Sequence, residues 1–273
     1  MNMLEGENIS VRINRLPILR DISFQVGAGE FIGLIGPNGS GKSTLLRILA
    51  GLSQPASGRL RIAGKPLKDY KSKELARMIG YVPQDTSIEF DFQVRDIVMM
   101  GRHPHLSRFR SESHHDRIMA QTAMEQTATL HLADRTASCL SGGQMQMVFI
   151  AKALAQEPEL LLLDEPISAL DIRYQLHVLE LMRNLSEKGL TVIAALHDLN
   201  LAARFCDRLA LLNRGEMVNI GEPEEVLTAD SIFKTYGVYA RVTADPWLGC
   251  PSVTALGGST HSSRLNKPDF AIT

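Results

Sequence analysis

A nine-residue stretch, residues 36–44 with the sequence GPNGSGKST, constrains the fold of this chain more than any other feature. It fits the phosphate-loop pattern G-x-x-x-x-G-K-[ST]. The fixed places of that pattern are taken by Gly36, Gly41, Lys42 and Ser43. The mostly apolar run 30–35 before it is short enough for a buried strand, and residues 45–50 after it suit the first turns of a helix. The order strand, loop, helix predicts a phosphate-binding site in an α/β core.

The residue types in this loop suit a triphosphate, whose charges need many donors at short range. Glycine lets backbone N–H groups turn toward one point, and the next helix adds free N–H groups and the positive end of its dipole. Lys42 can reach the β- and γ-phosphates, and the Ser43 hydroxyl can ligate Mg²⁺. The other loop residues predicted to contact the nucleotide are Pro37, Asn38, Gly39, Ser40 and Thr44. A plain glycine-rich turn is the alternative, which the flanking elements disfavour.

A second motif is the apolar run 160–163 followed by Asp164 and Glu165. It predicts a central parallel strand that ends in two acids. Because ligands of such sheets bind at the carboxyl ends of the strands, both acids are expected beside the phosphate loop. Asp164 suits the Mg²⁺ shell, directly or through water, and Glu165 can orient and deprotonate the attacking water. The alternative is a strand ending in a solvated acidic turn.

Two shorter strings precede predicted helices. The first string is Ser141, Gly142, Gly143 and Gln144. Its hydroxyl, its glycines and the start of a helix predicted over 145–155 can bind an anion together, and the alternative is a serine N-cap with glycines for a turn. The second string is SALD, residues 168–171. Its last residue, Asp171, precedes a helix predicted over 172–188 and can cap it.

The composition excludes several classes of protein. The chain has 273 residues, is 44% apolar and 22% charged, and carries a net charge of −1, so no global basic field points to nucleic acid. Three scattered cysteines are too few for a disulfide framework or a metal site. No apolar run approaches the ~20 residues that span a bilayer, and the N-terminus shows no signal-peptide core. Any membrane role is therefore expected to come through a partner.

The order of these motifs resembles the nucleotide-binding subunits of ATP-binding cassette (ABC) transporters. The matching strings, over about residues 3–240, are GPNGSGKS, Gln84, LSGGQ, LLLLDE, SALD and His197. The resemblance implies a P-loop NTPase core with a mostly parallel sheet, an antiparallel β subdomain and a helical subdomain. It places residues 1–256 in one such domain, with a helical insertion at about 85–155. Residues 257–273, rich in Gly, Ser and Thr, are expected to form a flexible tail.

The resemblance also implies roles that the residues alone do not establish. Residues 141–144 would bind the γ-phosphate of ATP held on the other subunit of a head-to-tail pair, and Asp171 would contact that subunit. Gln84 would join the metal shell and link the nucleotide to the membrane subunits. His197 follows an apolar strand predicted over 190–196, where a lone histidine is more often structural, and the resemblance makes it the switch that contacts the γ-phosphate.

Four positions depart from the family pattern. Ile13 stands where an aromatic side chain usually stacks on adenine. Met145 and Met147 replace two arginines after the signature, and Ile167 replaces a common threonine. We expect weaker nucleotide binding, because an aromatic ring and two positive charges are missing. The reaction class should stay the same, because no phosphate or metal ligand is lost.

Within the family, the strings at 92–105, 196–203 and 221–227 resemble importers of ferric siderophores, haem and cobalamin. The expected protein is an ATPase that uses ATP and Mg²⁺, works as a homodimer on two membrane permease subunits, and serves a substrate-binding protein indirectly. It would lie at the cytoplasmic face of the inner membrane. The alternative is a soluble ABC ATPase acting on nucleic acid or ribosomes, which usually shows two cassettes, a long coiled coil or a basic surface.

A helix is also predicted over 116–132.

Overall fold

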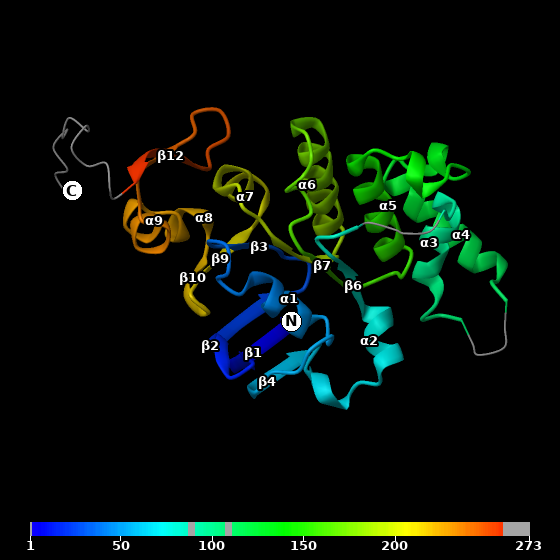
Figure 1. The fold of residues 1–273 in the computed structure, drawn as a ribbon, viewed down its shortest axis with the longest axis horizontal. Coiled ribbons are helices and arrows are strands. Elements are labelled where there is room, and N and C mark those ends of the chain that lie inside the picture. The colour runs from blue at the N-terminus through cyan, green and yellow to red at the C-terminus, as the bar shows by residue number, and fades with distance from the viewer. Residues whose placement is uncertain (1, 87–90, 107–110, 259–273) are drawn as a thin grey trace.

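The computed structural model describes residues 2–86, 91–106 and 111–258. Its centre is a six-stranded sheet in the order β10-β9-β3-β8-β7-β6, flanked by helices (Figure 1). Its strands are β3 (Phe31–Ile35), β6 (Ile79–Val82), β7 (Leu160–Leu163), β8 (Thr191–Ala195), β9 (Arg208–Asn213) and β10 (Glu216–Gly221). Neighbouring strands are parallel except β9 and β10. The sheet confirms the predicted α/β fold class.

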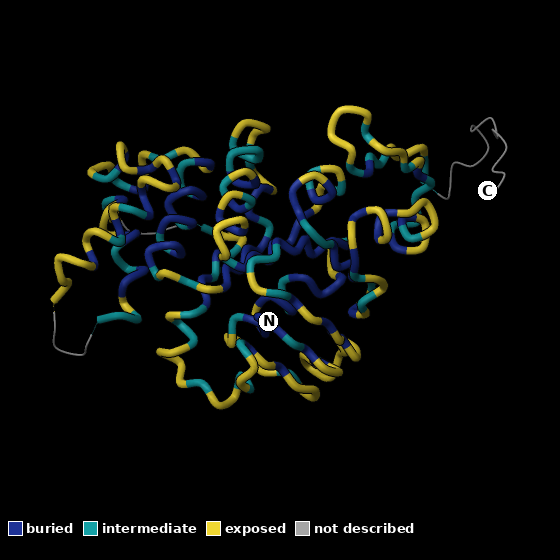
Figure 2. Tube along the Cα trace, turned by 180° about the vertical axis from the view of Figure 1, so that it is seen from behind, coloured by how far each residue is buried: buried dark blue, intermediate teal, exposed yellow. Residues whose placement is uncertain are grey.

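Alternate residues of the central strands point into two different hydrophobic cores, as the two-residue period of a strand requires. In β7, Leu160 and Leu162 face one core, whereas Leu161 and Leu163 face the other. The first core is closed by α1 (Lys42–Leu49), and the second by α5 (Gly142–Leu154), α6 (Ile172–Glu187) and α7 (Leu199–Phe205). Burial on both faces explains why the sequence of β7 is apolar throughout (Figure 2).

An antiparallel sheet in the order β2-β1-β4-β5 packs over α1. Its strands are β1 (Asn2–Ile13), β2 (Leu16–Gly27), β4 (Ser57–Ile62) and β5 (Lys65–Pro66). The first two strands, β1 and β2, form an antiparallel pair along their lengths. The short helix α2 (Ser72–Met78) then leads into β6.

The helical insertion forms an arm to one side of the sheet (Figure 1). Its elements are α3 (Val94–Met99), α4 (His114–Gln126), α5, and the 3-10 turns η2 (Met100–Arg102), η3 (Leu130–Leu132) and η4 (Ala137–Cys139). The single helix predicted over 116–132 is wrong in its bounds, because α4 begins at a Ser113 cap and ends at Gln126. The chain turns there because Ala128 has a left-handed backbone, with a φ of 54°.

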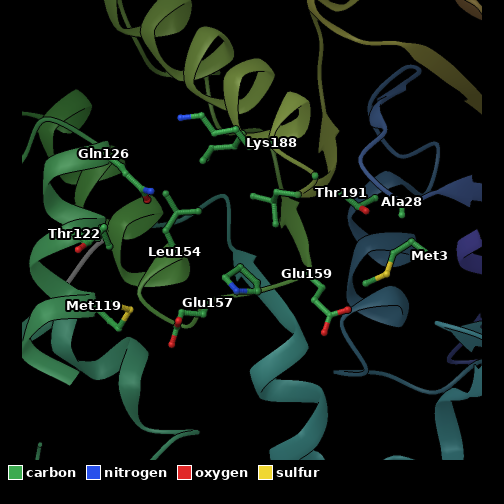
Figure 3. Close-up of a pocket in the computed structure, with 15 residues that line it drawn as sticks. Met3, Ala28, Met119, Thr122, Gln126, Leu154, Glu157, Glu159, Lys188 and Thr191 are labelled. Atoms are coloured by element: carbon green, nitrogen blue, oxygen red, sulfur yellow. The ribbon is translucent and has the colours of Figure 1, made fainter. Parts of the chain in front are cut away.

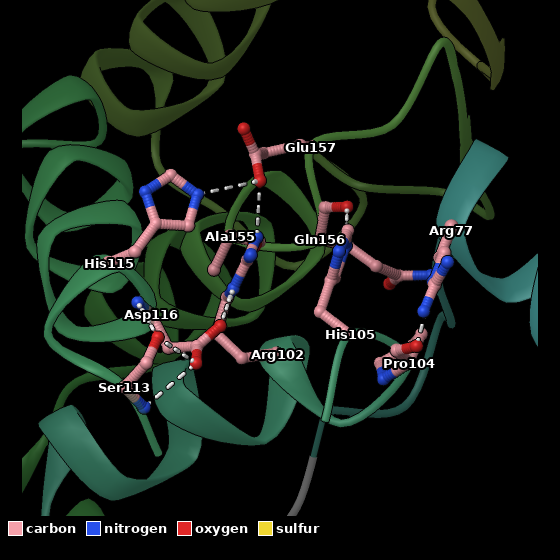
Figure 4. Close-up of polar contacts among 10 residues, drawn as sticks. All are labelled: Arg77, Arg102, Pro104, His105, Ser113, His115, Asp116, Ala155, Gln156 and Glu157. Atoms are coloured by element: carbon pink, nitrogen blue, oxygen red, sulfur yellow. Dashed lines mark hydrogen bonds and ion pairs between the residues drawn. The ribbon is translucent and has the colours of Figure 1, made fainter. Parts of the chain in front are cut away.

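A buried arginine holds this arm together (Figure 4). Arg102 is 1% exposed, and its guanidinium contacts Asp116 (3.0 Å), the carbonyl oxygen of Ala155 (2.6 Å) and Glu157 (2.7 Å). Hydrogen bonds from Ser113, together with Arg102, lower the pKa of Asp116 to about 2. The network ties η2 and α4 to the turn after α5, so a buried charge is fully paired.

The C-terminal part covers the far end of the sheet with α8 (Pro223–Val226), α9 (Ala229–Tyr236) and the hairpin of β11 (Val238–Ala244) and β12 (Pro251–Gly258). The predicted flexible tail began at residue 257, but β12 continues to Gly258. The rest of that tail, 259–273, lies outside the described residues. In the described ranges, no helix has the length and apolarity needed to cross a membrane.

Candidate nucleotide-binding site

The phosphate loop connects β3 to α1 in a conformation that requires glycine. Gly36 and Gly41 have φ values of 145° and 107°, and a Cβ on Gly36 would lie 2.1 Å from the carbonyl oxygen of Leu212. Gly41 is the N-cap of α1 and supplies no capping side chain. The first N–H groups of α1 are therefore left for an anion, as the sequence predicts.

Lys42 is buried at the start of α1 and closes over the loop. Its Nζ atom donates to the carbonyl oxygens of Gly36 (2.8 Å) and Pro37 (3.3 Å). Burial lowers the pKa of the Lys42 ammonium, while the charges of Glu165 and Asp164 act in the opposite direction. An ammonium held this way can exchange carbonyl partners for phosphate oxygens at little cost.

A hydroxyl and a carboxylate meet beside the loop, as expected for a magnesium site. The Ser43 Oγ atom donates to Asp164 Oδ1 (2.8 Å), and Tyr81 donates to Asp164 Oδ2 (3.3 Å). Asp164, 2% exposed, follows β7, and Tyr81 lies on the neighbouring strand β6. Burial raises the pKa of the Tyr81 hydroxyl, which keeps it a donor. The sequence analysis missed Tyr81, although its place three residues before Gln84 was a usable signal.

Two predicted residues, Gln84 and His197, contact the carboxylate of a third, Glu165. Glu165 Oε1 lies 2.6 Å from His197 Nε2, and Glu165 Oε2 accepts a hydrogen bond from Gln84 Nε2 (2.8 Å). Glu165 has a left-handed backbone with a φ of 52°, which turns its side chain out of the line of β7. A carboxylate oriented by an amide and an imidazole is suited to hold and deprotonate a water.

These groups share an open pocket of about 700 Å³. Its wall consists of Ile18, Asn38, Gly39, Ser40, Gly41, Lys42, Ser43, Thr44, Gln84, Glu165 and His197. The Ser40 hydroxyl, 2% exposed, has no hydrogen-bond partner in the described part of the chain. A buried unsatisfied hydroxyl fits a ligand that carries acceptor oxygens, such as a phosphate. Ile18, which sequence reasoning did not single out, provides the apolar part of the wall.

The remaining predicted residues lie away from this wall. Ser141 caps α5, accepting from the Gln144 N–H (3.3 Å), and Asp171 caps α6, accepting from the Tyr174 N–H (3.0 Å). Both capping alternatives raised by the sequence are therefore present, and neither excludes a contact with a second subunit. Ile13 is 51% exposed at the end of β1, and none of the described residues on the pocket wall is Phe, Tyr or Trp.

A second cavity, of about 530 Å³, lies at the amino ends of β7 and β8 (Figure 3). It is bordered by Met119 and Gln126 of α4, by Leu154 of α5, and by Glu159 and Thr191 beside the strands. None of the predicted motif residues lines it, and it faces the edge of the sheet opposite the phosphate loop. The 700 Å³ pocket is lined instead by residues 38–44 of the predicted phosphate loop, Gln84, Glu165 and His197.

The chain is similar to known proteins over nearly its full length. The family described as ABC transporter matches residues 19–168, more than half of the chain. The ferric enterobactin transport ATP-binding protein of Escherichia coli is 40% identical over 261 residues, covering 95% of this chain and 96% of that one. The cobalamin import ATP-binding protein of Halobacterium salinarum is also 40% identical over 261 residues, but this chain spans only 65% of its length.

Solved structures agree with the sequence relatives. A metal-chelate type ABC transporter in an inward-facing conformation superposes with a TM-score of 0.82 at 31% identity, covering 93% of this chain and 97% of that one. A dimeric ATP-binding cassette with bound ADP and phosphate superposes with a TM-score of 0.71 at 29% identity, covering 81% and 99%.

Proposed function

This chain belongs to the ABC transporter family, and from that membership we propose that it binds and hydrolyses ATP to energise an importer. One observation carries the proposal. Two sets of contacts lie beside the pocket that also holds Lys42: Ser43 bonds to Asp164, and both Gln84 and His197 contact Glu165. The set supplies a phosphate cradle, a metal ligand pair and a base in one place.

The nucleotide phosphates would lie on the loop N–H groups and Lys42, with Ser43, Asp164 and Gln84 as ligands for Mg²⁺. The ion, when bound, neutralises charge on the β- and γ-phosphate oxygens. Glu165 accepts the proton of the attacking water, and Gln84 and His197 keep its carboxylate aimed at that water. His197 can also donate to a γ-phosphate oxygen and so register its loss.

Two copies would pair head to tail, each lending residues 141–144 and Asp171 to the site of the other. The pocket wall of one chain contains none of these residues, so a single chain lacks donors on that side. The dimeric cassette with ADP and phosphate supports this arrangement. Gln84 and the helical insertion, about 85–155 within a domain of residues 1–256, would carry the motion to two permease subunits.

The names of the relatives indicate an iron chelate, haem or cobalamin as cargo. The chain would then be a peripheral subunit at the cytoplasmic face of the inner membrane, working with a substrate-binding protein. The test is purification of the tagged chain from detergent extracts, followed by assays of Mg²⁺-dependent ATP hydrolysis. A co-purifying many-helix membrane protein and Mg²⁺-dependent turnover support the proposal. A purified chain that turns over ATP only with RNA or ribosomes would replace it with the soluble alternative.

A further inference from the structure

The two glycines of the signature, Gly142 and Gly143, have opposite surroundings. A Cβ on Gly143 would lie 2.7 Å from Cγ, 2.8 Å from Cδ2 and 3.0 Å from Cδ1 of the Tyr174 ring. A Cβ on Gly142 would meet nothing within 4 Å. Gly142 therefore faces open space, whereas Gly143 is pressed against the base of an aromatic ring. These ring atoms are fixed by the Cβ of Tyr174 and cannot swing away as the end of a long side chain can.

Tyr174 is itself held in place at the start of α6. Its N–H donates to the Asp171 carboxylate (3.0 Å), and its half-buried ring packs against the larger hydrophobic core. In the described part of the chain its hydroxyl makes no hydrogen bond. The ring is therefore the part of the side chain that contacts Gly143. Beyond the ring lies a cavity of about 520 Å³. Shortening the side chain would extend that space toward Gly143, and the start of α5 would lose its support.

The same segment is tied to the proposed base. The N–H and hydroxyl of Ser168 donate to the carbonyl oxygen of Glu165 (3.3 and 3.1 Å). The Gln175 amide donates to the carbonyl oxygen of Ile167 (3.2 Å). Hydrogen bonds thus run from Glu165 through the SALD string to the first turn of α6, from which the ring of Tyr174 reaches Gly143.

We propose that Tyr174 is a positioning residue that holds the signature through Gly143 and couples it to Glu165 of the same chain. This inference rests on the proposed function, in which the signature completes the ATP site of the partner. The ring then joins the base of one site to the γ-phosphate donors of the other. Its loss should impair the signature while leaving the phosphate loop of its own chain intact.

Tyr174→Ala should therefore bind Mg²⁺–ATP as a single chain with an affinity within about twofold of wild type, while ATPase falls about 10- to 100-fold through misplacement of the signature. Tyr174→Phe keeps the ring and should restore wild-type turnover. In a Glu165→Gln background, ATP should dimerise the Phe variant but not the Ala variant on size-exclusion chromatography. Thermal unfolding of each full-length variant checks the fold, and Tyr174→Leu serves as a second truncation that keeps apolar bulk.

Mixing experiments separate a defect in the signature from a defect in the chain's own phosphate site. A Lys42→Ala chain has a broken phosphate loop and an intact signature, so its mixture with Tyr174→Ala should regain activity. Random pairing makes about half of the dimers mixed, and each mixed dimer has one intact site of its two. The mixture should therefore contain about a quarter of the intact sites of the wild type. Ser141→Arg mixed with Lys42→Ala is the matched control, because it breaks the signature directly.

Each other outcome overturns the inference. If Ser141→Arg is rescued by Lys42→Ala but Tyr174→Ala is not, Tyr174 does not act through the signature and the proposed function stands. Wild-type turnover and dimerisation of Tyr174→Ala would show that the contact is dispensable. Failure of both truncations to fold would make the ring a folding element instead. If Ser141→Arg is not rescued either, the two chains do not share an ATP site. The proposed arrangement of the dimer is then wrong, and so is this inference, which rests on it.

Discussion

His197 and Glu165 are in direct contact, with Nε2 of the imidazole 2.6 Å from Oε1 of the carboxylate. The second carboxylate oxygen accepts from Gln84, so the proposed base is held from two sides by residues that come from different loops. Each carboxylate oxygen keeps a second lone pair that can accept from a water. In the proposed mechanism Glu165 takes the proton, and Gln84 and His197 orient its carboxylate.

Glu165→Gln should abolish turnover while keeping nucleotide binding. The amide retains the shape and the hydrogen-bonding reach of the side chain but cannot accept a proton, which typically costs about 10²- to 10⁴-fold in rate. Lys42, Ser43 and the loop N–H groups are untouched, so the variant should bind ATP, dimerise and stay closed. Phosphate release and size-exclusion chromatography in Mg²⁺–ATP measure the two effects. Near-wild-type hydrolysis would remove Glu165 as the base, and loss of ATP binding would assign it a structural role.

His197→Ala should lower turnover less than Glu165→Gln does, because the base itself remains and only its aim is relaxed. A single hydrogen bond to a charged group is worth about 1.5–3 kcal/mol, or roughly 10- to 100-fold in rate. Steady-state kinetics should show the loss mainly in kcat. A variant as inactive as Glu165→Gln would instead give His197 a direct part in the chemistry.

Asp164→Asn should impair binding as well as rate, unlike Glu165→Gln. Asp164 touches the Ser43 hydroxyl and would share Mg²⁺ with it, so removing its charge weakens the hold on the ion. The Mg²⁺ concentration needed for half-maximal ATP binding should rise about tenfold or more. Tyr81→Phe is the matched control, since it removes a longer, 3.3 Å bond to the same carboxylate and should raise this concentration only slightly. An unchanged Mg²⁺ requirement in Asp164→Asn would take Asp164 out of the metal site.

The strands, the phosphate loop and the acidic pair could be predicted because short sequence patterns determine them. An all-apolar β7 is required for burial on both faces, and the loop glycines are required by positive φ angles. Contacts made by tertiary packing could not be predicted in this way. The ring of Tyr174 against Gly143, and the hydroxyl of Tyr81 on Asp164, each join elements distant in the sequence. The left-handed Ala128 that ends the turn after α4 gives no signal in the sequence, because alanine favours helix.

Ile13→Tyr should lower the Michaelis constant for ATP. Ile13 takes the place of the usual stacking aromatic, it is 51% exposed, and the described pocket wall has no Phe, Tyr or Trp ring. Base–aromatic stacking is worth about 1–3 kcal/mol, which corresponds to roughly fivefold or more in affinity. Leu52→Tyr, at an exposed leucine in the turn after α1, is the control. If Ile18→Tyr lowers the constant and Ile13→Tyr does not, the adenine lies beside β2 and not at the end of β1, where the family resemblance places it.

Asp116→Asn should destabilise the helical arm in a pH-dependent way. Its hydrogen bonds from Ser113 and its contact with Arg102 lower the pKa from 3.8 to about 2, so the folded state prefers the ionised carboxylate. The resulting stabilisation, about 2 kcal/mol, is fully present above pH ~4 and is lost as the pH falls toward ~2. Urea unfolding should therefore show a large difference between wild type and variant at neutral pH, and the difference should shrink as acid protonates Asp116. Glu157→Gln is the control, because that partner of Arg102 is 46% exposed and should cost less than about 1 kcal/mol. A difference between wild type and Asp116→Asn that does not change with pH would show that the Asp116 charge contributes nothing and that only its hydrogen bonds matter.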